Sequence, residues 1–470
     1  MNNILNIARR PARLRPLAAG VAALVLSGCA SFSADGGLDA VSTLTSQRTG
    51  QSVAFAKPAA DMPEVDRTVD QLLGKPLSAD SAVQVALLNN RGLRASLAQL
   101  GVAEADLVQA GRMSNPSFSF GRMVGGNEVE IDRSVMFDIV GLLTIPLRRN
   151  IEKGNFEAAK LGAAADAVRL AADARRAWVN AVAAQQAAGY AEQVRTSAEA
   201  SAELAKRMAT VGNLSKLDQM REQAFLSESL AQLARARHKA TAAREQLARL
   251  MGVWGAQTGF TLPDRLPDLP ATPKALERVE TLAMQQRLDV QMATRHTSAT
   301  ASALGLSKAT RFINVLQAGY TNKSTTSAPR ENGYAVEIEL PLFDWSGAKT
   351  ARAEATYMQS VARTADVAIR ARSEAREAYS AYRTAFDLAR HYNDEVVPLR
   401  KKISEETLLR YNGMLISVFE LLADAREQVS TVNTAIEAQR DFWLAETDLQ
   451  SAINGTGGAT DTGAAVAAAE

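Results

Sequence analysis

The sequence has one cysteine, three histidines and a formal net charge of only +2 in 470 residues. One cysteine cannot form an internal disulfide, and His238, His296 and His391 are too scattered to make a recognisable zinc site without carboxylates. A nearly balanced charge with no long basic tract argues against a dedicated nucleic-acid binder, because such proteins concentrate positive charge against phosphates. We therefore expect no metal site, no cofactor and no nucleic-acid partner.

Signatures of enzymes are also lacking. There is no Walker-type glycine-rich loop and no nucleophile elbow, so we expect the protein not to be an enzyme. Hydrophobic residues make up 47% of the chain, which is enough for a large core and excludes general disorder. Beyond the N-terminal region there is no apolar run of the ~20 residues that a spanning helix needs. Such a chain could cross a membrane only with strands.

The N-terminus has the pattern of an export signal. Four arginines between positions 9 and 15 precede the apolar stretch 17–26, and the tetrapeptide LSGC follows at 26–29. A basic segment, a short apolar segment and small residues at the cleavage point are typical of a secretory signal, and the stretch is too short to span a bilayer comfortably. LSGC resembles the bacterial lipobox, which predicts removal of residues 1–28 and a lipid on Cys29. Ala30, rather than Asp, resembles lipoproteins sent to the outer membrane; the alternative is a cleaved signal with an incidental cysteine.

Proline is absent between Pro146 and Pro263, and Pro398 is alone after Pro341. Because proline interrupts helices, long proline-free stretches rich in Ala, Leu, Arg and Glu predict long helices. Residues 148–211 would form a helix about 95 Å long. Pro398 would mark a break in a second long helix.

The two halves of the chain repeat one plan. A shift of about 200 residues aligns 175–178 with 376–379, Gly212 with Gly413 and Gly121 with Gly319. We therefore predict an internal duplication, with one copy at 78–255 and the other at 275–455. Each copy would contain a helix, two strands and two long helices joined by a turn. Residues 29–77 would form an extended, lipid-anchored linker, 256–274 a proline-rich linker and 456–470 a disordered tail.

Alternating residues predict a strand in each half. Val129, Ile131, Val135, Phe137 and Ile139 alternate with polar residues, with Arg133 and Met136 as exceptions, and Val336, Ile338 and Leu340 repeat the pattern. Alternation gives one apolar and one polar face, which a soluble half-buried sheet also shows. With an export signal it favours a membrane sheet, and since four strands cannot close a barrel, we expect three copies to assemble. The acids of the polar face, Glu130, Asp132, Asp138, Glu337 and Glu339, would then line the lumen and favour cations.

The sequence resembles the TolC-like outer membrane factors of bacterial tripartite efflux systems in four features taken together. These are the lipobox, the repeated plan of helices and strands, the strand ends at 145–147 and 340–343, and the glycines at the helix turns. The likeness covers about 78–455. It implies a mainly α fold with a small β part, in which a homotrimer builds a helical tunnel in the periplasm from duplicated long hairpins and a 12-stranded barrel in the outer membrane. The implied partners are a periplasmic adaptor and an inner-membrane pump, expected to be proton-driven. The alternative is a lipid-anchored periplasmic coiled-coil scaffold without a pore.

The turns between the long helices are the candidate adaptor-binding tips. The first comprises Val211, Gly212, Asn213, Leu214, Ser215 and Asp218, and the second Gly413, Met414, Leu415, Ile416 and Ser417. Glycine suits a helix end because it takes left-handed backbone angles, and serine suits the start of the next helix. Turn geometry does not explain the apolar residues at these exposed tips. The resemblance implies that the segment 211–218 docks on the adaptor.

A candidate gate follows the second tip. In the resembling family an acidic residue near this place helps to close the tunnel, and Asp424 matches it, with Leu421 one turn earlier as a hydrophobic constriction. The alternative is an ordinary solvated Asp–Arg helix face. Gln223 aligns with Asp424 in the first half, so only the second half is expected to gate. The exported cargo cannot be read from the sequence: drugs, metal ions, solvents and a secreted protein all remain open.

Overall fold

The computed structural model describes residues 31–53, 62–312, 315–339 and 343–455. The signal at 1–28, Cys29, Leu340 and the tail at 456–470 lie outside the described residues. The described part is mainly helical with one four-stranded antiparallel sheet, which confirms the predicted combination of a large α part and a small β part. It divides into two compact units: one holds the residues up to Gly36, Leu100–Ala159 and Thr294–Ala362, and the other Gly37–Gln99, Lys160–Ala293 and the residues from Arg363 on.

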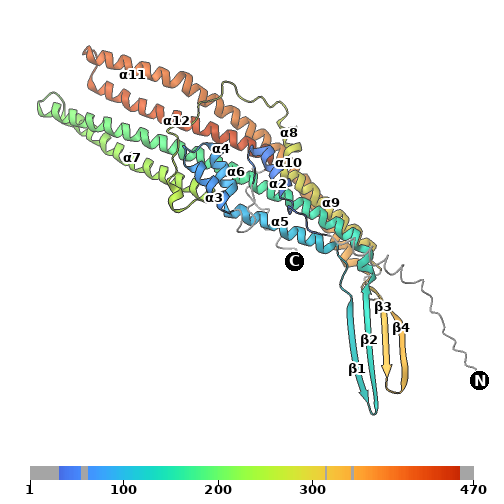
Figure 1. Ribbon diagram of the computed structural model, residues 1–470. Helices are drawn as coiled ribbons and strands as arrows, with labels where there is room; N and C mark the ends of the chain where they lie inside the picture. Colours follow the sequence, from blue (N-terminus) through green and yellow to red (C-terminus); the bar gives the residue numbers. More distant parts are fainter. Residues whose placement is uncertain (1–30, 54–61, 313–314, 340–342, 456–470) are drawn as a thin grey trace, which may run out of the picture. The chain divides into compact units, whose positions relative to one another are not determined.

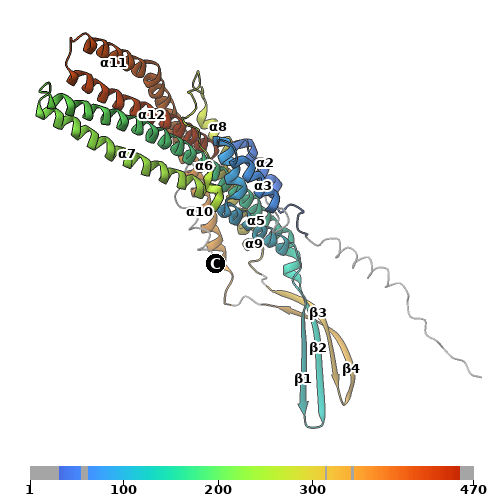
Figure 2. The ribbon, with the colours of Figure 1, turned by 60° about the vertical axis from the view of Figure 1, so that its left-hand side comes forward.

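The sheet lies in the first unit and consists of β1 (Ser117–Gly125), β2 (Glu128–Asp138), β3 (Leu316–Thr325) and β4 (Ala328–Ile338). The strands lie side by side in sequence order, β1-β2-β3-β4 (Figures 1 and 2). Two hairpins from distant parts of the chain meet where β2 pairs with β3, from Glu130 opposite Thr325 to Asp138 opposite Gln317. Residues 129–138 are in the predicted strand, but Ile139, which was predicted as its last residue, begins a helix. β4 begins well before the alternating residues that indicated it.

The described part of the first half contains six helices: α2 (Leu38–Thr49), α3 (Met62–Leu73), α4 (Ala79–Asn89), α5 (Arg91–Ala110), α6 (Ile139–Thr210) and α7 (Lys216–Met251). The prediction that α6 begins at 148, after Pro146, is wrong, because the helix starts at Ile139 and continues through the proline. Asp138 explains the early start, since its Oδ1 accepts a hydrogen bond from the Gly141 backbone N–H at 2.7 Å. Proline removes one backbone donor from the helix but does not end it here.

The second half begins with the short η1 (Gly255–Gly259), followed by α8 (Val279–Gln286) and α9 (Leu288–Ala309). After the sheet come α10 (Gly347–His391), a π-helical turn η2 (Tyr392–Val396), α11 (Val397–Asn412) and α12 (Val418–Asn454). Pro398 lies in the first turn of α11, so the break predicted there is a widened turn just before the proline. None of the described helices is both long enough and apolar enough to cross a membrane.

The second unit has its core where the long helices pack against the shorter ones. The face of α6 from Ala163 to Ala181 buries seven alanines, and small side chains allow neighbouring helices to approach closely. Trp178 is buried in this core and donates its indole N–H to the Leu77 carbonyl at 2.7 Å. A second cluster forms around Phe442, whose ring centroid lies 5.7 Å from those of Tyr382 and Phe386.

One buried arginine ties four helices of this unit together. Arg287 separates α8 from α9, and its side chain is 3% exposed. The guanidinium forms ion pairs with Asp289 at 2.7 Å and with Glu374 of α10 at 2.8 Å, and it donates to the Ala452 carbonyl of α12 at 3.0 Å. Burial opposes the charge, but the two carboxylates outweigh it and raise the pKa of Arg287 above its ordinary value. The arginine therefore stays charged and holds this joint.

Candidate functional site

The register of the sheet separates its charges. Asp132 lies opposite Lys323, which lies opposite Glu331, and Gln317 lies between Asp138 and Glu337. Since side chains alternate between faces, every acidic residue of the four strands falls on one face. These residues are Glu128, Glu130, Asp132, Asp138, Glu331 and Glu337. The structure thus brings four of the five predicted lumen acids onto one face, and the fifth, Glu339, lies just past the end of β4.

Three of these acids are engaged by neighbouring groups, and one of them is Glu128, which accepts a hydrogen bond from the Ser327 hydroxyl. The Lys323 ammonium lies 2.6 Å from a Glu130 carboxylate oxygen, across the β2–β3 junction. Asp138 caps α6 through the Gly141 N–H, as described above. Asp132, Glu331 and Glu337 therefore carry more of the uncompensated negative charge of this face.

The opposite face is apolar and uncovered. It carries Phe118, Phe120 and Val124 on β1, Val129, Ile131, Val135 and Phe137 on β2, and Tyr320, Tyr334, Val336 and Ile338 on β3 and β4. Tyr334 is 88% exposed and Phe118 67% exposed. Both edges of the sheet are open as well, because β1 and β4 each pair with one strand only within the described chain. A soluble protein seldom leaves so large an apolar face and two free edges in water.

Exposed apolar side chains continue beside the sheet, at the start of α6. Leu142, Leu143 and Leu147 are exposed there, and Arg148 follows directly. Trp345, between β4 and α10, is also exposed. The apolar surface of the first unit therefore extends from the strands into the first turns of a helix and ends at a charged residue.

The first helix turn has the predicted geometry. Gly212 has a positive φ of 82°, and the Asn213 N–H donates to the Met208 carbonyl at 2.9 Å, which closes the end of α6. The Ser215 hydroxyl accepts a hydrogen bond from the Asp218 N–H at 3.1 Å and caps α7. Val211 is exposed, while Leu214 is half-buried.

The second turn departs from the prediction. Gly413 has a φ of −80°, and Met414 takes the positive φ of 58° instead. The Leu415 N–H donates to the Arg410 carbonyl at 2.9 Å, so Met414 occupies the position that Gly212 occupies in the first turn. A positive φ is uncommon for a residue other than glycine, and it points to a constraint on this tip. Ser417 caps α12, Ile416 is half-buried, and Met414 and Leu415 are among the most exposed apolar residues of the chain.

Sequence reasoning missed part of this apolar surface. Met220 on α7, and Leu408 and Leu409 on α11, are also exposed near the turns. They lie within helices, where an apolar residue normally predicts burial, so the pattern gave no signal for them. These residues lie about one turn of helix, or slightly more, from the loops that join the long helices. Closeness to the loops is the signal that could have identified them.

Asp424 is placed inside its own hairpin. Its side chain is 10% exposed and lies between α11 and α12, where Arg400 approaches it at 3.6 Å and the Ser404 hydroxyl donates to it. Leu421, one turn earlier, is half-buried. Asp424 is therefore not part of a solvated helix face.

A second buried acid joins the two hairpins. Glu222 of α7 is 3% exposed at its side chain and forms an ion pair with Arg426 of α12 at 2.8 Å. The Arg426 guanidinium also lies over the Phe225 ring, 4.6 Å from its centroid. Since Met414 is equivalent to Gly212, the residue equivalent to Asp424 is Glu222, and the alignment of Asp424 with Gln223 is wrong by one position. Both halves thus carry a buried acid near the tip.

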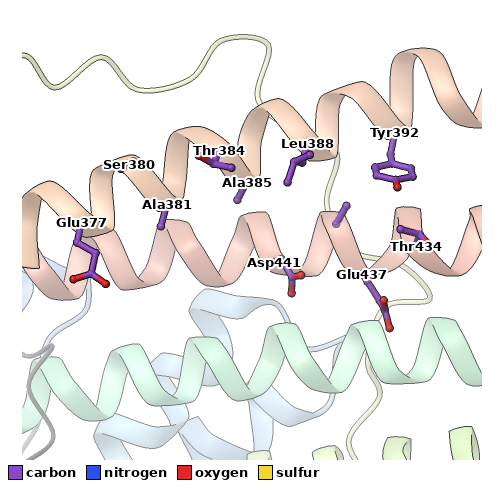
Figure 3. Close-up of a pocket in the computed structure, with 11 residues that line it drawn as sticks. Glu377, Ser380, Ala381, Thr384, Ala385, Leu388, Tyr392, Thr434, Glu437 and Asp441 are labelled. Carbon is purple, nitrogen blue, oxygen red and sulfur yellow. The ribbon is translucent and has the colours of Figure 1, made fainter.

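A surface groove of about 780 Å³ runs between α10 and α12 (Figure 3). Its lining includes the carboxylates of Glu377, Glu437 and Asp441, with Leu388 and Tyr392 beside them and no lysine or arginine. Among the residues that the structure describes, no group of three or more His, Cys, Asp or Glu side chains is placed to hold a metal ion.

No protein-family model matches the sequence, and no curated protein matches it. Three solved structures show its fold. The outer-membrane channel OprN has a TM-score of 0.68 at 19% identity, with 88% of this chain and 95% of that chain covered. The CmeC outer membrane channel of Campylobacter jejuni has a TM-score of 0.65 at 15% identity, with 91% and 94% covered. The open state of the MtrE outer membrane channel of Neisseria gonorrhoeae has a TM-score of 0.67 at 17% identity, with 80% and 88% covered. The chain therefore has the fold of bacterial outer membrane channels, as its resemblance to the TolC-like outer membrane factors predicted.

Proposed function

We propose that the protein is the outer membrane channel of a tripartite efflux system, a passive duct from a periplasmic adaptor and an inner-membrane pump to the exterior. The observation that carries this proposal is the sheet, which has one apolar face, one acidic face and two open edges. Open edges are not tolerated in lipid, so the sheet must be closed by further copies of the chain. Strands of 9, 11, 10 and 11 residues are long enough to enter a membrane as tilted barrel strands and to project beyond it where the apolar start of α6 completes the span.

A homotrimer closes such a barrel with twelve strands and places the acidic face in the lumen. The helical tunnel of the trimer is built from two hairpins per chain, and their elements correspond in length: α5 and α9 have 20 and 22 residues, and α7 and α12 have 36 and 37. This correspondence supports an internal duplication. The exposed carboxylates of the lumen face favour cations over anions.

The helix tips are proposed to dock on the adaptor. Val211 and Leu217 at the first tip, and Met414 and Leu415 at the second, expose apolar surface where no packing within the chain requires it. The positive φ of Met414 supports a functional role, because strained backbone is retained where a specific side chain is needed. The pump, expected to be proton-driven, would supply the energy and choose the cargo.

Asp424 and Leu421 are proposed to belong to the gate at the periplasmic end. Asp424 holds α11 and α12 together through Arg400 and Ser404, so its removal should loosen the hairpin that the gate is built from. Trimers with Asp424→Ala should conduct more than the unmodified protein in planar bilayers. An unchanged conductance would remove Asp424 from the gate.

A lipid on Cys29 would lie near the first unit, which contains the sheet. The Ser33 N–H donates to a Glu104 carboxylate oxygen at 2.6 Å, so the chain is fastened to α5 four positions after Cys29. Four residues span at most about 14 Å. A lipid on Cys29 would therefore enter the membrane close to α5, with the helices in the periplasm.

The decisive experiment uses the full chain from outer-membrane fractions. A channel should run as a heat-modifiable trimer on gels and conduct ions in planar bilayers. Reversal potentials in a salt gradient should show cation preference, and anion preference would remove the proposed role of the acidic face. A soluble-like monomer without conductance would favour the coiled-coil scaffold.

A further inference from the structure

Three arginines stand apart from the acidic residues of the sheet. Arg122 lies opposite Ile131 and Arg133 opposite Phe120, so both belong to the apolar face, and Arg330 of β4 follows them by alternation, since its neighbour Glu331 is on the acidic face. All six acidic residues of the strands lie on the other face, together with Lys323. The apolar face therefore carries positive charge and no negative charge in its strands. Because Arg122 and Arg133 are diagonal neighbours on adjacent strands, their Cα atoms are about 7–8 Å apart.

A polar row crosses the apolar face at Arg133. The register aligns Phe120, Arg133, Asn322 and Asn332 on four successive strands. Arg133 Nη1 donates to Asn322 Oδ1 at 3.0 Å, and Asn322 Nδ2 donates to Asn332 Oδ1 at 2.7 Å. The Tyr320 hydroxyl also donates to Asn332 Oδ1, at 2.7 Å. Arg133 thus uses one of its five donors within the described chain, and the structure gives Arg122 no partner there.

The position of this row fits the boundary of a membrane. An arginine that faces lipid is costly at the midplane and cheap near the headgroups, so the row belongs at the edge of the hydrocarbon layer. From Asn322 back to Leu316 the strand covers about 20 Å, which is about 15 Å of depth at a tilt of ~40°. The helical stretch from Ile139 to Leu147 adds about 13 Å before Arg148. The sum is close to the ~30 Å of a bilayer core.

We propose that Arg122 and Arg133 bind the phosphate of an anionic lipid headgroup in the outer leaflet. The site lies on the lipid-facing side of the barrel, so this inference rests on the proposed function. Guanidinium groups present forked donors that match phosphate oxygens, and the free donors of both arginines lie where lipid headgroups begin. Asn322 accepts a hydrogen bond from Arg133 and is itself bonded to Asn332, which also accepts from Tyr320. These contacts hold Arg133 in place, so the site is partly formed before a lipid binds.

The test measures lipid binding to the purified full-length trimer. Phosphatidic acid, whose headgroup is a phosphate monoester, is titrated onto the trimer and counted by native mass spectrometry, with phosphatidylcholine as the neutral comparison. Arg122→Gln combined with Arg133→Gln should weaken phosphatidic acid binding by at least about ten-fold, because charge-assisted hydrogen bonds are lost. Lys323→Gln is the matched control, since it removes one positive charge from the opposite face, and it should change binding less than two-fold by the same reasoning.

A second variant tests the site without removing an arginine. Asn322→Asp places a carboxylate 3.0 Å from Arg133 with little change in shape and should also weaken phosphatidic acid binding. If all variants bind this lipid as the unmodified trimer does, or if inorganic phosphate at the same concentration displaces it, the lipid site is wrong. Conductance is recorded on the same trimers. Trimers that conduct normally but bind phosphatidic acid no better than phosphatidylcholine would overturn the lipid site alone, whereas failure to form a conducting trimer would overturn the channel and the lipid site together.

Discussion

Replacing Arg426 with glutamine should open the helical end of the channel far more than replacing Glu222 with glutamine. The two residues form the ion pair between the hairpins, but their surroundings differ, because the Glu222 side chain is 3% exposed and the Arg426 side chain 39% exposed. Without Arg426 the buried carboxylate has no counter-charge, and Oε2 of Glu222 already lacks a hydrogen-bond partner among the described residues. Without the Glu222 charge, Arg426 can still be hydrated.

The size of the difference follows from this asymmetry. A buried ion pair that loses one partner costs about 3–5 kcal/mol, which the protein can avoid by letting water reach Glu222 as α7 and α12 separate. At about 1.4 kcal/mol per factor of ten, this shifts the ratio of open to closed states at least about 100-fold. Glu222→Gln keeps an acceptor oxygen for Arg426 but removes the negative charge, which weakens the hydrogen bond by about 1–1.5 kcal/mol and shifts the ratio roughly ten-fold.

Single-channel recordings of trimers in planar bilayers measure this ratio as the open fraction. The expected order is Arg426→Gln above Glu222→Gln, with the double variant close to Glu222→Gln because no charge is left unpaired. Arg235→Gln is the control, since it removes an exposed arginine whose ion pair with Glu228 lies within α7 and joins no two helices. A larger effect of Glu222→Gln, or a double variant equal to Arg426→Gln, would refute the reasoning.

Three further variants test other parts of the structure. Gly319→Ala should cost about 1–3 kcal/mol and lower the temperature at which the trimer dissociates on gels, because a Cβ there would overlap the Val135 carbonyl oxygen, whereas Gly121→Ala meets nothing closer than 3.9 Å and should be tolerated. Equal effects of the two would contradict this. Arg287→Ala should lower stability by about 3–5 kcal/mol in thermal unfolding followed by circular dichroism, since it leaves two carboxylates without their counter-charge; a loss under about 1 kcal/mol would mean that the joint is hydrated. Met414→Gly should relieve about 1 kcal/mol of backbone strain yet weaken adaptor binding in pull-down assays, and unchanged binding would make the tip structural only.

Local signals in the sequence were sufficient for the long helices and for one strand, but not for α2 and α3, which lie in the stretch 29–77 that was predicted to be extended. Long proline-free stretches predicted α6 and α12, and alternation predicted β2. The early start of α6 was missed because it depends on the hydrogen bond from the Gly141 N–H to Asp138. The positions of prolines in the sequence do not indicate this contact. β1 alternates only over residues 117–120, and the first half of β4 contains polar residues and glycine, so pairing with β2 and β3 decides their conformation.

The candidate sites were predictable to a different extent. Apolar residues at the turns were visible in the sequence, because a turn is normally polar. The partners of the buried acids were not, since Arg426 lies 204 positions from Glu222 and only the packing of the helices brings them together. The one-residue shift between the halves could not be predicted either. Gly413 has the residue type expected at a helix end, but Met414 takes the left-handed backbone conformation.

The junction between β2 and α6 has a mechanical consequence. β2 ends at Asp138 and α6 begins at Ile139, with no loop between them, and α6 then runs uninterrupted for 72 residues. In the second half, β4 ends at Ile338, α10 begins only at Gly347, and the π-helical turn Tyr392–Val396 interrupts the helix again. The first half thus has one uninterrupted helix after its strand, while the helical path of the second half is interrupted in two places. The second path should therefore yield to a force on its tip more readily than the first.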